Sequence, residues 1–351
     1  MNQPPIRTAL LSYGMSGEIF HGPLLSAVDG FTMHSIVERR TEKAKHRYPS
    51  VRISKTIDDV MNDPDVELIV VNTPNETHFE YTERALENGK HVVVEKPFTV
   101  TSNEAERLIN LSKAVSRTLT VFQNRRWDSD FLTIKRILKD GRLGKIVEFS
   151  AHYDRFRNYV EANTWKEESR PGTGILYNLG SHMLDQVVSL FGMPDFVDAR
   201  IGIQRPRGKV DDFYDIRLQY PQLLVIVKSS YLVKEPMPRY ILHGVNGSFV
   251  KFGIDPQEQA LKDGRTPGDA TWGMEDREYF GKINVMADGN SEEARISSER
   301  GDYREFYRNL FQVIRHGGEL VVKPEEAMEV IRLIEACYES NRNRCAVEIR
   351  K

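Results

Sequence analysis

The sequence predicts a chain of the α/β plus α+β class. An N-terminal Rossmann doubly wound parallel sheet is followed by a C-terminal domain with an open, mostly antiparallel sheet. Short apolar runs alternate with helical patterns from Ile6 to about Phe122, whereas strand-like segments mostly follow one another in the second half. The length of 351 residues also fits two domains, since a domain usually holds about 100–200 residues. We place the first domain at residues 1–123 and the second at residues 124–351.

The first half contains the pattern of a sheet that is covered by helices on both faces. Its continuous β-branched runs indicate strands buried on both sides, as parallel strands are. The stretches 77–88 and 102–116 have apolar residues at helical spacing, and Gly89 suits the left-handed end of a helix. Together they predict a doubly wound sheet. The expected strands are Thr8–Leu11, Phe31–Val37, Glu67–Asn72, His91–Glu95 and Thr118–Phe122.

The second half changes character after Trp127. Asn246-Gly247 is a strong signal for a two-residue hairpin turn. Residues 155–173 lack periodicity and suggest an irregular loop near a site, and residues 254–300 give no clear pattern. The expected helices are 128–139, ended by Gly141, 175–190, 303–315 and 324–341. The expected strands are 146–153, 196–204, 214–219, 223–231, 239–243 and 248–252.

Composition excludes several classes of partner. Lys and Arg total 49 against 51 Asp and Glu, so charge gives no reason to expect nucleic acid or an anionic membrane as a partner. The N-terminus lacks the features of a signal peptide, and the apolar runs are too short to span a bilayer. Cys337 and Cys345 resemble neither a disulfide framework nor a metal site. We therefore expect a reduced, cytoplasmic protein without a bound metal.

The first strand leads into a candidate dinucleotide-binding turn. Such a turn needs small residues, because the backbone must approach a pyrophosphate and the helix N-terminus must donate amides to it. Gly14 and Gly17 match the second and third glycines of G-x-G-x-x-G, while Ser12 replaces the first. An ordinary strand–turn–helix connection is the alternative. The candidate contacts are Ser12, Tyr13, Gly14, Met15, Ser16 and Gly17.

The end of the second strand is where a ribose would be bound. Glu38 is suited to accept hydrogen bonds from a 2′-hydroxyl, which favours NAD. Arg39 and Arg40 are suited to hold a 2′-phosphate, which favours NADP. A solvated charge run is the third interpretation, so the residues leave the choice open.

Lys96 follows a buried strand in the sequence Glu95-Lys96-Pro97. Ligands bind at the carboxyl edge of an open α/β sheet, where a lysine ammonium can hydrogen-bond a substrate oxygen. The alternative is a salt bridge at the strand end. A polar turn after the preceding strand has side chains suited to a ribose or nicotinamide: Thr73, Pro74, Asn75 and His78.

A predicted helix of the second half has Asn178, His182 and Asp185 at positions i, i+4 and i+7, which share one helix face. A histidine beside a carboxylate or an amide is a workable proton-transfer group near neutral pH. The alternative is a buried histidine that only holds the helix in place. Zinc is less favoured, because no cysteine or third histidine is nearby.

Taken together, these motifs resemble the glucose–fructose oxidoreductase/inositol dehydrogenase (Gfo/Idh/MocA) family, in the same order and with the same spacing. The resemblance is strongest to its NADP-dependent scyllo-inositol dehydrogenase branch, through segments such as 20–25, 124–128 and 255–258. It implies that Lys96 supports the reacting hydroxyl and that His182 is the general base. It also implies that Asn124 and Arg125 lie near the cofactor and the substrate.

Two positions depart from the family pattern: Ser12 for the first glycine and Asn178 for an aspartate. Since an amide carries no charge, we expect a less basic His182. The expected activity is hydride transfer between NADP (NAD possible) and a cyclitol or sugar, with a scyllo-inositol-like polyol favoured. The alternatives are an aldose or other sugar dehydrogenase and a non-catalytic nicotinamide-sensing regulator. Residues expected to shape the substrate choice are Tyr153, Arg155, Arg157, Asn158 and Trp165, and we expect a homodimer or homotetramer.

Overall fold

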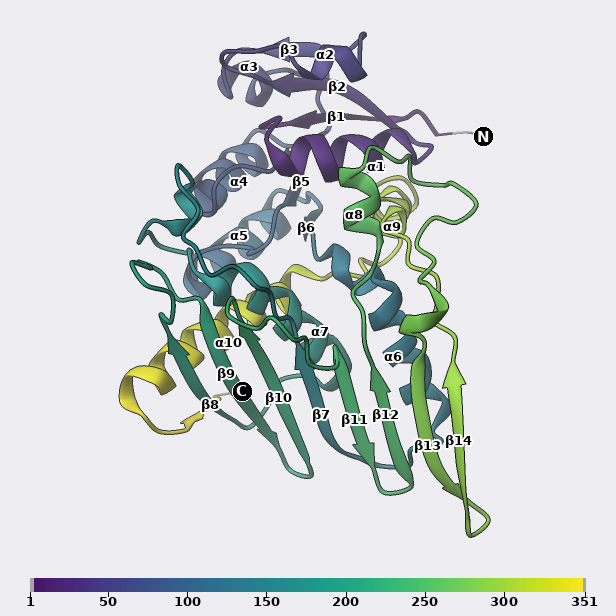
Figure 1. Cartoon of the computed structure of the whole chain (residues 1–351). Helices are drawn as coiled ribbons and strands as arrows, with labels where there is room; N and C mark the ends of the chain where they lie inside the picture. The colour runs from purple at the N-terminus through teal and green to yellow at the C-terminus, as the bar shows by residue number, and fades with distance from the viewer. Residues whose placement is uncertain (1–2, 350–351) are drawn as a thin grey trace. The chain divides into compact units, whose positions relative to one another are not determined.

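The computed structural model describes residues 3–349, and its elements are labelled in Figure 1. The chain forms two compact units. Unit 1 comprises Met1–Trp127, Pro256–Trp272 and Asp302–Met328. Unit 2 comprises Asp128–Asp255, Gly273–Gly301 and Glu329–Lys351. Unit 1 therefore combines the N-terminal part of the chain with two segments from its second half.

Within residues 3–349, unit 1 forms a six-stranded parallel sheet in the order β3-β2-β1-β4-β5-β6, which confirms the predicted Rossmann sheet. Its strands are β1 (Ile6–Leu10), β2 (Phe31–Val37), β3 (Arg52–Ser54), β4 (Leu68–Val71), β5 (His91–Val94) and β6 (Leu119–Val121). Its helices are α1 (Gly22–Ser26), α2 (Ala44–Arg47), α3 (Asp58–Met61), α4 (His78–Glu87), α5 (Ser102–Ala114), α8 (Gln257–Lys262) and α9 (Arg304–His316). A π-helical turn, η1 (Ser16–His21), runs directly into α1.

Local sequence signals explain several of these strands and helix ends. All four residues of β4 are fully buried, as a β-branched run in a covered sheet requires. Helix α5 begins with a capping box, in which Thr101 and Glu104 each accept the other's backbone N–H. Gly89 follows α4 with φ of +71°, which confirms its predicted role. The short elements β3, α2 and α3 were not predicted, because three or four residues show no period.

Unit 2 forms, in the part of the chain that the structure describes, a nine-stranded sheet in the order β14-β13-β12-β11-β7-β10-β9-β8-β15. Strands β7 and β10 are parallel and the other pairs are antiparallel, so the sheet is mostly antiparallel, as predicted. Its strands are β7 (Ile146–His152), β8 (Phe196–Gly202), β9 (Phe213–Tyr220), β10 (Leu223–Ser230), β11 (Tyr240–Gly244), β12 (Gly247–Lys251), β13 (Gly281–Ala287), β14 (Asn290–Ile296) and β15 (Val347–Glu348). Its helices are α6 (Ser129–Asp140), α7 (Ser181–Phe191) and all but the first turn of α10 (Pro324–Asn343).

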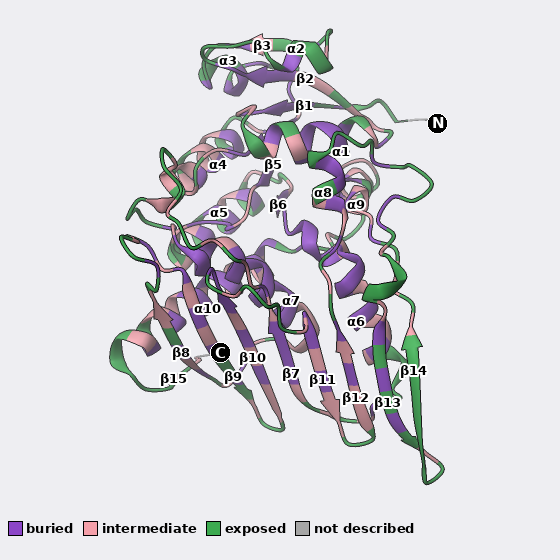
Figure 2. Ribbon diagram, viewed as in Figure 1, coloured by how far each residue is buried: buried purple, intermediate pink, exposed green. Residues whose placement is uncertain are grey.

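Burial alternates along the strands of this sheet, as Figure 2 shows. Phe149, Tyr214 and Tyr240 are fully buried on the face covered by helices. The opposite face carries half-buried residues such as Ile226 and Ile241. This pattern is typical of a sheet that packs helices on one side only.

One prediction for the second half of the chain needs correction, and the region 254–300, which gave no clear pattern, contains regular elements. Gly244 pairs with Gly247, so the turn of the β11–β12 hairpin is Val245-Asn246, one residue before the predicted position. A Cβ on Gly247 would overlap the Asn284 carbonyl and lie 2.7 Å from Cα of Val285, so this glycine allows close strand packing instead of a turn. The region 254–300 contains α8, β13 and β14; β14 is almost entirely exposed and therefore has no apolar period.

Among residues 3–349, no helix is long and apolar enough to cross a membrane.

Candidate functional site

The carboxyl edge of the unit 1 sheet collects most of the residues that the sequence singles out. The turn after β1 is tied to the end of β4 by Ser12 and Asn72. Oδ1 of Asn72 accepts the Ser12 N–H at 2.9 Å, and Nδ2 donates to the Ser12 carbonyl at 2.8 Å. The Ser12 hydroxyl donates to the Asn72 carbonyl at 2.8 Å. Ser12 does not have positive φ, so the backbone of this turn forms without the first glycine of the motif.

The two glycines of the turn have different surroundings. A Cβ on Gly17 would overlap the Ser12 carbonyl oxygen and lie 2.9 Å from Nδ2 of Asn72. Gly17 is therefore required by the packing of η1 against the end of β1. A Cβ on Gly14 would meet only Oγ of Ser12, at 3.8 Å. The space beside Gly14 is open to a ligand, as a pyrophosphate-binding turn requires.

The rest of the turn presents polar and exposed groups. Met15 is exposed and Ser16 begins η1. The Tyr13 ring packs edge-on against Tyr48 at 6.4 Å, and burial is the main cause that raises the pKa of Tyr13 to about 12. Arg47 lies over the Tyr48 ring. The Tyr13 hydroxyl therefore stays protonated and neutral beside the end of β2.

The Glu38 carboxylate is occupied by its own turn. It accepts hydrogen bonds from the Thr41 hydroxyl, from the Lys43 N–H at 3.0 Å and from the Ala44 N–H at 2.8 Å. Glu38 is buried, while Arg39 and its neighbour Arg40 are exposed. The carboxylate thus stabilises the start of α2, and the exposed groups at this strand end are guanidinium groups.

The turn after β4 is stabilised by hydrogen bonds among its own residues and with His78. Hydroxyls of Thr73 and Thr77 lie 2.6 Å apart, and Asn75 begins the short η2 helix (Asn75–Thr77). The fully buried His78 ring faces two carbonyls, with Nδ1 2.8 Å from the Pro97 oxygen and Nε2 3.0 Å from the Thr73 oxygen. Burial lowers the pKa of His78, so the ring is neutral and donates to one of them. His78 thus connects the loops that follow β4 and β5, and its predicted contact with the cofactor stays a prediction.

The Glu95-Lys96-Pro97 turn follows β5, as predicted. Lys96 is half-buried, and the Lys96–Pro97 peptide bond is cis. Oε2 of Glu95 accepts the Lys96 N–H at 3.1 Å, and Oε1 lies 3.0 Å from Nε2 of the buried His21. Burial alone would raise the pKa of Glu95, but the hydrogen bond from His21 and the nearby positive charges lower it overall. Glu95 is therefore ionised at neutral pH beside Lys96.

Asn124 and Arg125 lie in a short helix, η3 (Asn124–Trp127), which follows β6, and both are buried. Arg125 forms an ion pair with Glu258 of α8. Glu258 also binds Lys262 at 2.6 Å. The sequence placed Arg125 near the substrate, and the structure adds a carboxylate that neutralises its charge.

The helix that carries His182 belongs to unit 2 and begins with a π-helical turn, η5 (Leu176–Gly180), which continues into α7. Asn178 is half-buried in this turn, while His182 and Asp185 are buried in α7. Asn178 thus lies in the π turn, whereas His182 and Asp185 lie in the α-helix that follows it. Turns of this kind are frequent at functional sites.

Asp211 holds the start of this helix. Its Oδ2 accepts the Leu176 N–H at 2.9 Å, and Oδ1 accepts the Tyr338 hydroxyl at 2.8 Å. The Tyr338 ring stacks on Tyr177 at 6.0 Å. Gly174 has φ of +100°, and a Cβ there would lie 2.7 Å from Oδ2 of Asp211. No sequence pattern pointed to Asp211, which lies 35 residues from Leu176.

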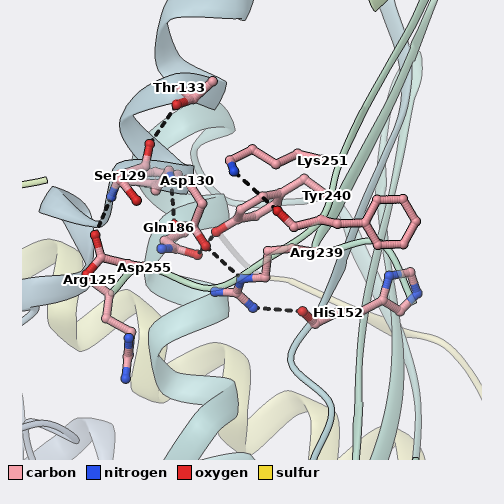
Figure 3. A network of polar contacts seen from close by, with 12 residues as sticks. Arg125, Ser129, Asp130, Thr133, His152, Gln186, Arg239, Tyr240, Lys251 and Asp255 are labelled. Atoms are coloured by element: carbon pink, nitrogen blue, oxygen red, sulfur yellow. Dashed lines mark hydrogen bonds and ion pairs between the residues drawn. The ribbon is translucent and has the colours of Figure 1, made fainter. Parts of the chain in front are cut away.

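A buried polar network braces α7 against the sheet, as Figure 3 shows. Gln186, one turn after His182, accepts a hydrogen bond from the Tyr240 hydroxyl at 2.8 Å. The adjacent Arg239 lies 3.2 Å from Oδ2 of Asp130 and donates to the His152 carbonyl at 2.8 Å. Helix α7 is therefore attached to β11 through Tyr240, while Arg239 connects α6 to the end of β7.

The residues predicted to determine the choice of substrate differ in how deeply they are buried. Tyr153 is buried under Arg239, whose guanidinium carbon lies 4.3 Å from the ring centre. Arg155 and Trp165 are half-buried. Trp165 begins the short η4 helix (Trp165–Glu167) within the irregular loop 155–173. Tyr153 is thus the most deeply buried of these three, and the predicted substrate contacts stay predictions.

Arg205 anchors this loop. Its guanidinium donates to the Tyr159 carbonyl at 2.7 Å and pairs with Glu167 at 2.8 Å and with Asp212 at 2.8 Å. The Arg205 side chain is only 1% exposed. The loop is therefore attached to the sheet by one buried cation that the sequence did not single out.

Comparison with known proteins matches both halves of the chain. Residues 6–123 match the model "Oxidoreductase family, NAD-binding Rossmann fold", and residues 135–349 match "Oxidoreductase family, C-terminal alpha/beta domain". The chain is 40% identical to scyllo-inositol 2-dehydrogenase (NADP(+)) IolW of Bacillus subtilis, covering 97% of this chain and 94% of that protein. It is similar to the structure of yvaA from Bacillus subtilis, with a TM-score of 0.97, 39% identity and full coverage of both chains. An oxidoreductase from Bacillus cereus has a TM-score of 0.92, 32% identity and coverage of 99% of each chain.

Proposed function

Because the chain belongs to the Gfo/Idh/MocA oxidoreductase family, we propose that it transfers a hydride between NADP and a secondary hydroxyl of a cyclitol, with a scyllo-inositol-like polyol as substrate. The family membership makes it an oxidoreductase with an NAD(P)-binding Rossmann domain. The observation that carries the proposal is the placement of Lys96 after β5, at the edge of the sheet that also presents the Ser12–Gly17 turn.

The residues at this edge fit a dinucleotide. The open space beside Gly14 permits close approach of a phosphate, and the start of η1 offers backbone amides to it. Glu38 is engaged with its own turn, whereas Arg39 and Arg40 are exposed. Guanidinium groups suit a 2′-phosphate, so these contacts favour NADP over NAD.

In the proposed mechanism, side chains of the protein accept the proton of the substrate hydroxyl and stabilise the negative charge that develops on its oxygen. The bound nicotinamide supplies the hydride chemistry. Lys96 donates to the reacting oxygen and stabilises negative charge on it as the hydroxyl loses its proton. His182 accepts that proton. Asn178, without a charge, makes His182 less basic than an aspartate would.

The substrate class is tested by initial rates with NADP⁺ and NAD⁺ across a panel of inositols, aldoses and glycosides. The proposal predicts the highest kcat/KM with NADP⁺ and a cyclitol. Faster turnover of an aldose or a glycoside would show that the substrate is a sugar instead of a cyclitol. The assignment of the chain as a dehydrogenase would stand. A D-glucoside 3-dehydrogenase of Escherichia coli is 24% identical over 61% of this chain, which is why glycosides belong in the panel. Tight nucleotide binding without turnover of any compound would favour a nicotinamide-sensing regulator.

We also propose that the uncovered face of the unit 2 sheet binds a second copy of the chain. Ile226, Ile241 and Val250 lie in one row across it, in register through Ser150. All three apolar side chains are half-exposed, and a sheet face of this kind usually seeks a partner. Light scattering should give at least a dimer, and Ile241→Glu should reduce the mass toward that of a monomer. A monomeric native chain would contradict this assignment.

A further inference from the structure

A buried chain of polar contacts lies behind the Glu95–Lys96 turn of unit 1. The Tyr307 hydroxyl of α9 lies 2.6 Å from Nδ1 of His21, and Nε2 of His21 lies 3.0 Å from Oε1 of Glu95. The second carboxylate oxygen of Glu95 accepts the Lys96 N–H at 3.1 Å. His21 is the last residue of η1, so the π-helical turn that follows the glycine turn contributes directly to these contacts.

The chemistry of the groups fixes the direction of the hydrogen bond between His21 and Glu95. An ionised carboxylate only accepts, so Nε2 of His21 donates to Glu95. In a neutral ring Nδ1 then accepts, and the Tyr307 hydroxyl donates to it. Burial raises the pKa of Tyr307 well above its ordinary value, so that hydroxyl keeps its proton. His21 is fully buried and Phe122 packs on its ring at 4.4 Å, which leaves the ring little freedom to turn.

We propose that His21, oriented by Tyr307, is a positioning residue that holds the Glu95 carboxylate on the backbone N–H of Lys96, so that its negative charge acts on Lys96 during turnover. This role rests on the proposed function of Lys96 in catalysis. Burying a carboxylate costs free energy, and apolar side chains in the same place would avoid that cost. A role for the carboxylate at Lys96 explains why the buried polar groups are present.

The charges around Glu95 support this coupling. The groups that act on it are His21 from η1, Lys96 from its own turn, His78 from α4 and Tyr307 from α9. Lys96 favours the ionised carboxylate. Because coupling is reciprocal, the carboxylate favours the Lys96 ammonium by the same free energy. Loss of the carboxylate, or of its orientation, should therefore lower the pKa of Lys96.

The titration of Lys96 tests this proposal on the full chain without relying on turnover. Lysines are labelled by reductive ¹³C-methylation and followed by NMR as a function of pH, and Lys96→Arg identifies the signal. Glu95→Gln and His21→Leu should lower the Lys96 pKa by about one unit or more, the usual scale for a close opposite charge. His21→Gln, whose amide can still donate to Glu95, should restore much of the shift. Tyr307→Phe, a mild variant that removes only one hydroxyl, should give a smaller shift in the same direction.

Tyr220→Phe is the matched control, because it removes a hydroxyl that donates to the Gly192 carbonyl in unit 2. It should leave the titration unchanged. An unshifted Lys96 in both His21→Leu and Tyr307→Phe would overturn the proposal, and any loss of activity in them would then reflect folding alone. If Lys96→Met stays active, the proposed catalytic role of Lys96 fails, whereas the coupling between His21, Glu95 and Lys96 is still decided by the titration.

Discussion

The two glycines of the turn after β1 provide a paired prediction, because each should affect a different property. In Gly17→Ala the new methyl group would overlap the Ser12 carbonyl and lie 2.9 Å from Nδ2 of Asn72. Overpacking of this kind costs about 1–3 kcal/mol. Disturbing the hydrogen bond from Asn72 to Ser12 adds about 0.5–1.5 kcal/mol. The unfolding free energy should therefore fall by about 2–4 kcal/mol.

In Gly14→Ala the methyl group meets only Oγ of Ser12, at an ordinary contact distance of 3.8 Å. Stability should change by less than about 0.5 kcal/mol. The methyl group would, however, occupy the space that a phosphate needs. We expect the Kd for NADP⁺ to rise about tenfold or more, which corresponds to about 1.4 kcal/mol.

Thermal unfolding of the nucleotide-free variants and calorimetric titration with NADP⁺ separate these effects. Gly17→Ala should lower the Tm by several degrees, at about 2–4 °C per kcal/mol. Gly14→Ala should keep the native Tm and lose affinity. A Gly14→Ala protein that binds NADP⁺ normally would show that the backbone at this residue does not approach the phosphates, and the reasoning would be refuted.

Three further changes have defined outcomes. Burial and nearby guanidinium groups lower the pKa of His91 to about 4, so the unfolded chain takes up a proton first as the pH falls from 6.5 to 4. Stability should drop by up to about 3 kcal/mol across that window, and urea denaturation of His91→Gln should show a smaller drop. Arg205→Met leaves the fully buried Asp212 carboxylate without its cation, so the free energy of unfolding should fall by about 3–5 kcal/mol. The loop 155–173 should also become sensitive to limited proteolysis. Protease resistance equal to that of the native chain would argue against Arg205 as the anchor of this loop. Replacing Arg39 and Arg40 together by Ser should raise the Kd for NADP⁺ about tenfold or more and change the Kd for NAD⁺ little. An equal loss of affinity for both nucleotides would show that these arginines do not bind the 2′-phosphate.

Much of the fold was predictable because its signals are local. Continuous β-branched runs marked the strands, and Gly89 and Gly141 marked helix ends that the structure has at φ of +71° and +69°. Lys96 could be placed at the ligand edge, because the residue after a parallel strand lies there. Strand β14 left no trace in the sequence, because an exposed edge strand needs no apolar alternation.

The supporting residues of the site were not predictable, because they are contacts between distant segments. His21 and Tyr307 are separated by 286 residues, and Ser12 and Asn72 by 60. The π turn that contains Asn178 was missed for a related reason: it depends on Asp211 and Gly174, and the spacing of apolar residues in the helix itself does not reveal it. Sequence patterns thus located the groups that would meet a ligand better than the groups that hold them.

The role of Lys96 is tested most directly by comparing Lys96→Met with the native enzyme, using NADP⁺ and the polyol or sugar that gives the highest rate. Removing a group that stabilises developing oxygen charge costs about 10²–10³ in kcat. We expect a loss of that size, with the Kd for NADP⁺ within a few-fold of the native value. A Lys96→Met enzyme that turns over at a near-native rate would contradict the proposed mechanism.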